Sequence, residues 1–282
     1  MEISTQEINE FIDTVKTYST YDFSEYSDKS FMRRIEKVLM DNQMNISALN
    51  EKIKWDNLFL EQIIKEITVN TTELFRDPKI WQILRHNILK KYEEEETINI
   101  WHAGCSTGQE VYSMLILLNE MNLFDKARVY ATDLNTDVID VAMKGKYKFR
   151  EILEYVENYR QVIEENPFNF DESAKIPYTK YFEVNKTKDI VKVKPFLLNK
   201  VIFSKHDLVN DGNIFGVQFH IIMCRNVLIY FNHNLQNRLF DFFYQSLYDN
   251  GSLIIGRHEG ILGTIASKFK KKETIYIKSS NM

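Results

Sequence analysis

The sequence predicts an α/β protein in which a small all-helical domain precedes a mostly parallel, doubly wound sheet. From Ile98 onward, short apolar segments alternate with helical segments, an order typical of a sheet covered by helices on both faces. Over the first 70 residues, apolar residues instead recur at helical spacing and no glycine interrupts them. The length of 282 residues suits two such parts, since one domain takes roughly 150 residues.

Composition and charge exclude several classes of protein. The net charge of −4 argues against the basic surface that broad nucleic-acid binding needs. No apolar run approaches the roughly 20 residues of a membrane-spanning helix, and the N-terminal segment does not resemble a signal peptide. Two cysteines cannot form a disulfide framework, and the six histidines lack ligand-like spacing. We therefore expect a cytoplasmic protein without bound metal, nucleic acid or membrane insertion.

Three segments of the N-terminal part are predicted to be helices. They are Glu7–Tyr18, Ser30–Met40 and Leu58–Ile67, each with an apolar stripe along one face. We place the helical domain at residues 1–70, a linker with a connecting helix at 71–97, and the sheet domain at 98–282.

The sheet domain is predicted to contain six strands and three principal helices. The strands are Ile98–His102, Arg128–Thr132, Val201–Ser204, Phe219–Cys224, Ser252–Gly256 and Thr274–Lys278, and the helices are Glu110–Glu120, Asn135–Lys144 and Leu235–Tyr248. The alternation stops between about 146 and 200, where three of the four prolines lie and glycine is absent. A loop of that length without structure is uncommon, so we expect an inserted subdomain of helix and short strands.

The strongest local signal is a strand, a glycine turn, a helix and a second strand that ends in an acid. The first strand leads into Gly104–Gly108, and the second ends at Asp133. Ligands of doubly wound sheets lie at such strand ends, and a carboxylate there can accept hydrogen bonds from both ribose hydroxyls of a nucleoside. The alternative is a structural turn with Asp133 as a helix N-cap. Because neither a dinucleotide fingerprint nor a P-loop is present, the pattern favours a nucleoside without a diphosphate, of which S-adenosylmethionine is the common one.

Four ordered motifs resemble the chemoreceptor glutamate methyltransferases of the CheR family. They are NTTELFRD at 70–77, AGCSTGQEVYS at 103–113, ATD at 131–133 and CRNVLIYF at 224–231. The resemblance implies a Rossmann-like methyltransferase sheet with an antiparallel last strand. It also implies a monomer that transfers a methyl group from S-adenosylmethionine to glutamates in the cytoplasmic domains of chemotaxis receptors. The products would be glutamate methyl esters and S-adenosylhomocysteine.

The same resemblance assigns roles to individual residues. Those expected to contact the cofactor are Asn70, Thr72, Arg76, Gly104, Glu110, Asp133, Asp207, Leu208, Arg225 and Asn226. Arg76 and Tyr230 are expected at the reaction centre, where they would position groups rather than transfer protons. Structural alternatives remain open: an ion pair for Arg76 or Arg225, a core position for Tyr230, and a strand-end cap for Asn226.

A basic stripe on the second predicted helix is the candidate docking surface. Lys29, Arg33 and Lys37 follow one another at i, i+4 and i+8, with Arg34 beside them. The corresponding helix of the family docks the acidic helical bundle of a receptor. The alternative is an ordinary solvated helix face.

Several positions depart from the family pattern. Gln109, Val111 and Asp207 replace a common Glu, Pro and Asn, and Asp207 brings a second acid near the expected nucleoside. The insert lacks the glycine of the loop that binds a receptor tether in some members, which puts tethering in doubt. Two rival functions also remain: methylation of another carboxylate or small molecule, and a nucleotide-binding signalling module without turnover.

Overall fold

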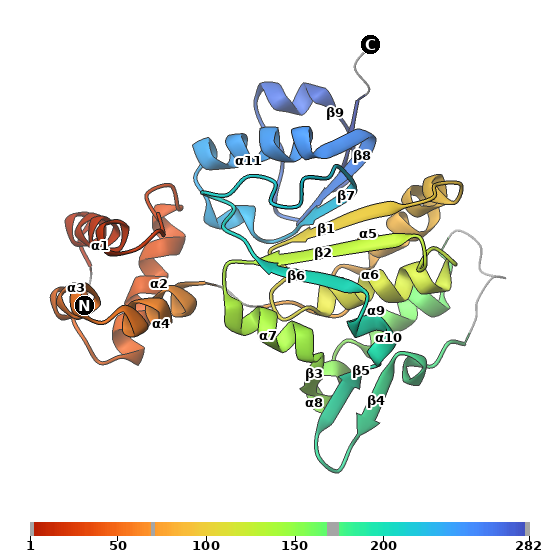
Figure 1. Ribbon diagram of the computed structural model, residues 1–282, viewed down its shortest axis with the longest axis horizontal. Coiled ribbons are helices and arrows are strands. Elements are labelled where there is room, and N and C mark those ends of the chain that lie inside the picture. The colour runs from red at the N-terminus through yellow and green to blue at the C-terminus, as the bar shows by residue number, and fades with distance from the viewer. Residues whose placement is uncertain (1–2, 69–70, 168–174, 280–282) are drawn as a thin grey trace.

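The computed structural model describes residues 3–68, 71–167 and 175–279. It contains a helical body and a larger sheet body that lie side by side (Figure 1). Three clusters of buried apolar side chains stabilise them: one inside the helical body and one on each face of the large sheet.

The helical body contains one more helix than the sequence patterns indicate. Its members are α1 (Thr5–Tyr18), α2 (Asp28–Asp41), α3 (Ile46–Trp55) and α4 (Asn57–Ile67). The unpredicted α3 is short, and its start is marked by Asn45, whose side chain accepts a hydrogen bond from the Ala48 N–H. Phe11, Ile35 and Leu49 are fully buried between the helices.

In the part of the chain that is described, the main sheet has seven strands in the order β6-β2-β1-β7-β8-β10-β9, which confirms the predicted mostly parallel sheet. Its strands are β1 (Ile98–Ala103), β2 (Ala127–Asp133), β6 (Val201–Lys205), β7 (Phe219–Cys224), β8 (Leu247–Ile255), β9 (Phe269–Lys272) and β10 (Ile275–Lys278). The strand β10 is antiparallel to both of its neighbours, β8 and β9, as the expected antiparallel last strand requires. The edge strand β9 was not predicted, because three of its four residues are lysines.

The junction between the last helix and β8 differs from the sequence prediction. Helix α11 (His233–Ser246) ends before Leu247, which belongs to β8 and not to the helix. Phe240 and Phe243 are the buried aromatic residues of this helix, whereas Phe242 is half-buried. The β8 strand therefore starts five residues earlier than Ser252 and ends at Ile255 rather than at Gly256.

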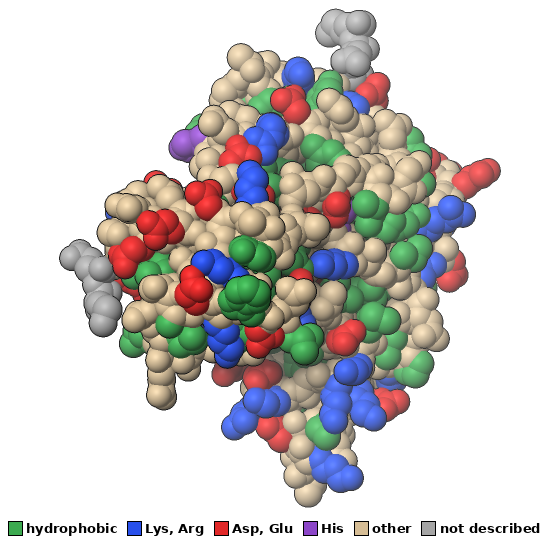
Figure 2. Space-filling view, turned by 60° about the vertical axis from the view of Figure 1, so that its left-hand side comes forward, with side chains coloured by type: hydrophobic (Ala, Val, Ile, Leu, Met, Phe, Trp, Pro, Cys, Tyr) green, Lys and Arg blue, Asp and Glu red, His purple; other side chains and the backbone are tan. Residues whose placement is uncertain are grey.

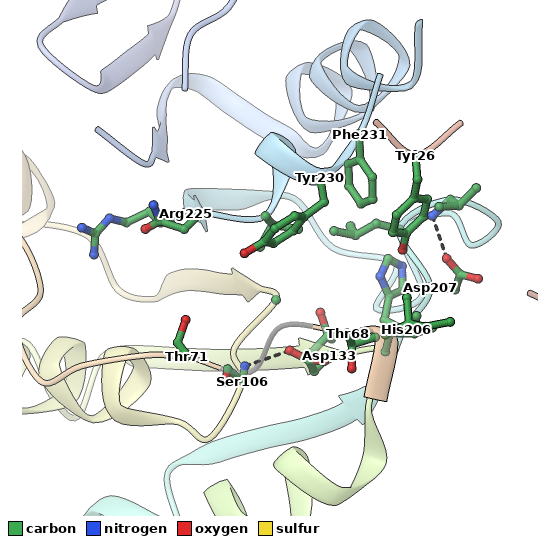
Figure 3. Close-up of a pocket in the computed structure, with 18 of the residues that line it drawn as sticks. Tyr26, Thr68, Thr71, Ser106, Asp133, His206, Asp207, Arg225, Tyr230 and Phe231 are labelled. Carbon is green, nitrogen blue, oxygen red and sulfur yellow. Dashed lines mark hydrogen bonds between the residues drawn. The ribbon is translucent and has the colours of Figure 1, made fainter. Parts of the chain in front are cut away.

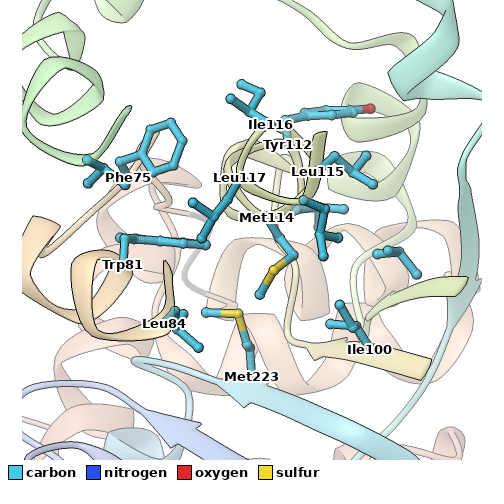
Figure 4. Close-up of a cluster of buried hydrophobic side chains, with 14 of the residues drawn as sticks. Phe75, Trp81, Leu84, Ile100, Tyr112, Met114, Leu115, Ile116, Leu117 and Met223 are labelled. Atoms are coloured by element: carbon cyan, nitrogen blue, oxygen red, sulfur yellow. The ribbon is translucent and has the colours of Figure 1, made fainter. Parts of the chain in front are cut away.

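Helices cover both faces of the sheet. Helix α11 packs on one face, while α6 (Gln109–Glu120), α5 (Pro78–Ile83) and its continuing turns (Leu84–Ile88 and Leu89–Tyr92) pack on the other. Figure 4 shows Met114 on α6 facing Met223 of β7, with Trp81 and Phe75 beside them. Helix α7 (Thr136–Lys144) follows β2 and contacts both β2 and β6.

The described part of the segment between α7 and β6 forms a small separate sheet. It contains β3 (Lys146–Lys148), β4 (Phe182–Asn185) and β5 (Ile190–Val193), all antiparallel, with the short helices α8 (Phe149–Leu153), α9 (Val156–Tyr159) and α10 (Pro195–Leu198). Lys146, Lys148 and Lys192 are exposed on it. Lys and Arg side chains gather at the lower end of the face drawn in Figure 2, the end at which this small sheet lies in Figure 1.

The two bodies meet through the loop between α1 and α2. The Ser27 N–H donates to the Tyr230 carbonyl (2.8 Å), and the Asn232 N–H donates to the Glu25 carbonyl (2.8 Å). The Tyr26 ring lies edge-on against Phe231, with the ring centroids 5.1 Å apart. The helical body is therefore held against the segment that follows β7.

Candidate functional site

A pocket opens at the carboxyl ends of β1, β2, β6 and β7, and the helical body forms its far wall (Figure 3). This is where a doubly wound sheet binds its ligand. Seven of the residues predicted for the site line this pocket: Gly104, Asp133, Asp207, Leu208, Arg225, Asn226 and Tyr230. Arg34, which was predicted as part of the docking surface on the second helix, also lines it.

The glycine turn after β1 forms one wall of this pocket. Gly104 has a φ of +85°, and its N–H and that of Cys105 both donate to the Thr132 carbonyl at 2.8 Å. A Cβ at position 104 would come within 2.5 Å of a Val227 methyl group. The hydroxyl of Ser106 is buried and has no hydrogen-bond partner within the described ranges. The turn is thus narrow and offers an unsatisfied polar atom.

Asp133 lies opposite this turn at the end of β2. Its carboxylate accepts hydrogen bonds from the Ser106 N–H (2.8 Å) and the Asn135 N–H (3.0 Å). Burial raises the pKa of this carboxyl above its ordinary value, although those backbone donors oppose the rise. The cap of α7 is Asn135, which accepts from the Asp137 N–H, so the alternative reading of Asp133 as the N-cap is wrong.

Asp207 and Leu208 follow β6 and border the pocket on the adjacent side. Both oxygens of Asp207 are engaged within its own loop: one accepts from the Val209 N–H (2.8 Å) and the other from the Asn210 side-chain amide (2.9 Å). The second acid near the expected nucleoside therefore stabilises a turn.

Arg225 links three parts of the chain through its guanidinium group. The Arg225 side chain is 1% exposed. It forms ion pairs with Asp77 (2.7 Å) and Glu110 (3.1 Å) and donates to the Arg76 carbonyl (3.0 Å). In Figure 3 it points away from Asp133 and Tyr230. The Arg225 side chain therefore forms buried ion pairs, as the structural alternative for this residue expected.

Glu110, on the first turn of α6, is the second member of this ion cluster. Its other oxygen lies 2.9 Å from His102 Nδ1. Burial by itself would raise the pKa of Glu110, but His102 and Arg225 outweigh it and hold that pKa below its ordinary value. Glu110 is therefore an ionised partner of Arg225 and does not line the pocket.

Tyr230 stands at the boundary with the helical body. The Arg34 guanidinium lies over its ring, 4.6 Å from the centroid, and donates to the Ile67 carbonyl at 2.9 Å. Lys29, Arg33 and Lys37 are exposed on α2, and Lys37 is 3.9 Å from Asp41. The residues of the predicted docking surface are thus divided: three of them face solvent, and Arg34 faces the pocket.

The remaining predicted residues are not brought into the pocket wall. The Arg76 side chain is 3.9 Å from Glu73, and Thr71 lines the pocket where Thr72 was expected. Asn70 lies outside the described residues. Across the part of the chain that is described, no His, Cys, Asp and Glu group could hold a metal ion. No helix of the described ranges is both long and apolar enough to cross a membrane.

Sequence reasoning missed Tyr26 and His206 among the residues that line the pocket, and it missed Glu259, which contacts the loop after β7. Tyr26 comes from the other body, so no local pattern could place it beside Phe231. His206 is buried beside Trp101, with ring centroids 5.4 Å apart. Glu259 follows β8, and its carboxylate accepts the Asn226 N–H at 3.0 Å. The local sequence marks Glu259 by nothing more than its place in the short segment that follows β8.

The narrow glycine turn leads to a first prediction. Replacing Gly104 by alanine is expected to weaken binding of S-adenosylhomocysteine by about tenfold or more, because the new methyl group meets Val227 and φ is positive. Titration calorimetry measures this affinity. Gly216→Ala is the matched control, since it also has a positive φ (+63°) but has nothing within 4 Å of its Cβ. Equal affinities of the two variants would contradict this role for Gly104.

The sheet order, the single antiparallel strand and the glycine turn opposite an acid define the chain as an S-adenosylmethionine-dependent methyltransferase. The pocket residues fit this cofactor, because a side chain at Gly104 would collide with Val227 on the pocket wall and the Ser106 hydroxyl has no hydrogen-bond partner among the described residues. The chain belongs to the CheR methyltransferase family: the family described as "CheR methyltransferase, SAM binding domain" matches residues 70–176 and 168–277.

Named relatives agree with this family. The chain is 34% identical over 256 residues to a protein named as methyltransferase Cher3 of Pseudomonas putida, covering 90% of this chain and 89% of that one. It is 28% identical to a chemotaxis protein methyltransferase of Listeria monocytogenes, with 89% of both chains covered. Among solved structures, the glycopeptide N-methyltransferase MtfA with bound S-adenosylmethionine aligns with a TM-score of 0.35 at 9% identity, over 65% of this chain and 54% of that chain.

Proposed function

We propose that this protein transfers a methyl group from S-adenosylmethionine to glutamate carboxylates of chemotaxis receptors. The products are glutamate methyl esters and S-adenosylhomocysteine. The observation that carries the proposal is a pocket in which Asp133 and Tyr230 face each other across the strand ends, in a family whose relatives are named for chemotaxis.

The chemistry requires alignment more than proton transfer. A glutamate carboxylate, with an ordinary pKa near 4.3, is already ionised at neutral pH and needs no general base. The cofactor supplies an electrophilic methyl group on a sulfonium. Holding two reactants in line can contribute roughly 7–11 kcal/mol to lowering the barrier. In this proposal Asp133 binds the ribose hydroxyls and the Tyr230 ring packs beside the methyl group.

Positive charge beside Tyr230 supports a carboxylate as the methyl acceptor. The Arg34 guanidinium lies over the Tyr230 ring and is half-buried, so it can attract an incoming acidic side chain into the pocket. The exposed stripe of Lys29, Arg33 and Lys37 would then dock the acidic surface of the receptor from outside. We further propose a monomer that acts in the cytoplasm on receptor cytoplasmic domains.

Arg76 remains a proposed reaction-centre residue and is tested separately. Arg76→Ala is expected to lower kcat/KM for methyl transfer by about tenfold or more, through loss of a fork-like carboxylate contact. The melting temperature should stay unchanged, because the partner of its side chain is the half-buried Glu73, 3.9 Å away. Lys79→Ala, which removes an exposed cation that pairs with Glu273, is the control. Near-normal turnover of the Arg76 variant would remove this residue from the reaction centre.

The proposed function is tested with labelled methyl groups. The protein is incubated with methyl-labelled S-adenosylmethionine and a receptor cytoplasmic fragment, and the fragment is then treated with base. We expect label on the fragment that base releases as methanol. A fragment that stays unlabelled while the protein binds S-adenosylhomocysteine would contradict the receptor as substrate. Label on free small carboxylates alone would support the small-molecule alternative.

A further inference from the structure

The loop that carries Asn226 and Tyr230 leaves the sheet in an unfavourable backbone conformation. Asn226 has a φ of +60°, in the left-handed region that an L-residue adopts at a cost. A single turn of 3-10 helix, Leu228–Tyr230, follows directly. Such a short turn has few hydrogen bonds of its own, so something outside the loop must hold it.

The Glu259 carboxylate provides that support from the end of the neighbouring strand. One of its oxygens accepts the Asn226 N–H (3.0 Å) and the Gly256 N–H (2.5 Å), and the other accepts the Ile229 N–H (3.2 Å). These contacts bridge the end of β8 to both ends of the segment that precedes Tyr230. Hydrogen bonds from backbone N–H groups to a carboxylate are among the stronger ones in proteins.

Gly256 leaves the space that this carboxylate occupies. A Cβ at position 256 would lie 2.8 Å from Glu259 Oε2 and 2.9 Å from the Asn226 backbone nitrogen. Burial also raises the pKa of Glu259, with the backbone donors opposing the rise. The contact is therefore a close fit between one carboxylate and the backbone of two loops.

We propose that Glu259 is the positioning residue of the methyl-transfer pocket: its carboxylate fixes the Asn226–Ile229 backbone and thereby the place of the Tyr230 ring. Glu259 does not line the pocket and acts through the loop that does. From the opposite side, Ser27 of the helical body donates to the Tyr230 carbonyl, so Tyr230 is held between two supports. This inference rests on the proposed function of Tyr230.

The test replaces Glu259 by glutamine, which keeps the size but puts an NH2 group among N–H donors. Glu259→Gln is expected to lower kcat by about tenfold or more, while affinity for S-adenosylhomocysteine falls much less, because Asp133 is untouched. In a Tyr230→Ala background, the same change should lower kcat by less than about threefold further, since its effect runs through Tyr230. Glu273→Gln, an exposed carboxylate paired with Lys79, is the control.

Two outcomes would overturn the inference. One is an unchanged kcat in the Glu259→Gln variant. The other is a double variant in which the fold-loss of kcat equals the product of the fold-losses of the Glu259→Gln and Tyr230→Ala single variants. If the glutamine variant does not fold, Glu259→Asp retains the charge but is one methylene too short to reach both Asn226 and Ile229. The Glu259→Asp variant should then also show a large loss of kcat and a much smaller loss of affinity for S-adenosylhomocysteine.

Hydrogen exchange distinguishes failure of this inference from failure of the proposed function. The Asn226 and Ile229 amides should exchange faster in Glu259→Gln than in the wild type and in Glu273→Gln, whether or not a receptor fragment is methylated. Unchanged exchange at these amides would contradict the positioning role itself. Faster exchange without any methyl transfer by the wild type would contradict only the proposed substrate.

Discussion

Arg225→Met is expected to lower the free energy of unfolding by about 3–5 kcal/mol, because it leaves Asp77 and Glu110 without their shared cation. The Arg225 side chain is 1% exposed, so water cannot replace the lost ion pairs without entering the core. Chemical denaturation followed by circular dichroism measures this loss. Arg225→Lys should recover part of it, since one ammonium group cannot reach both carboxylates and the Arg76 carbonyl in the same geometry.

The matched control is Arg160→Met on the surface of the inserted segment. Arg160 pairs with Glu157 at 3.0 Å, but its side chain is 54% exposed. Exposed ion pairs contribute roughly 0–1 kcal/mol, so this substitution should be nearly neutral. If both methionine variants lost the same small amount of stability, the Arg225 cluster would not hold the linker against the sheet as we infer.

Asp133→Ala is expected to weaken binding of S-adenosylhomocysteine by about 10- to 100-fold, the equivalent of about 1.5–3 kcal/mol for hydrogen bonds to a charged group. The carboxylate already accepts the Ser106 and Asn135 N–H groups and has lone pairs left for ribose hydroxyls. Calorimetry measures the affinity, and Asp140→Ala, an exposed acid on α7, is the control. Unchanged affinity in the Asp133 variant would remove this assignment.

The same residue predicts how affinity depends on pH. Burial raises the pKa of Asp133 above its ordinary value of 3.8, and the ionised form is the better acceptor for ribose hydroxyls. Affinity should therefore fall as the pH falls through that raised pKa. In Asp133→Asn the affinity should be lower at neutral pH and should lack this acidic decline. A decline of equal size in the asparagine variant would assign the titration to another group.

Local patterns in the sequence predicted much of the sheet and part of the site. The strand, glycine turn and second strand place Gly104 opposite Asp133, because parallel strands bring their carboxyl ends to one edge. Arg225 and Tyr230 were found through motif resemblance, yet only the fold shows that the Arg225 guanidinium points into an ion cluster. A motif defines where a residue lies along the chain but not the direction of its side chain.

Contacts between the two bodies were beyond sequence reasoning. Arg34 belongs to a basic helix and was grouped with Lys29, Arg33 and Lys37, although the docking of α2 turns it toward Tyr230. Tyr26 reaches the pocket through a bridge to Phe231, more than 200 residues away in sequence. Such pairings depend on how two separately packed cores meet, and helical periodicity carries no information about that.

We infer that the pocket between the helical body and the strand ends seats the nucleoside of S-adenosylmethionine. A crystal structure with S-adenosylhomocysteine tests it most directly. We predict the ribose hydroxyls within hydrogen-bonding distance of the Asp133 carboxylate and the sulfur atom facing the Tyr230 ring. A nucleoside bound elsewhere on the molecule, with Asp133 and Tyr230 free of ligand contact, would exclude this pocket as the cofactor site.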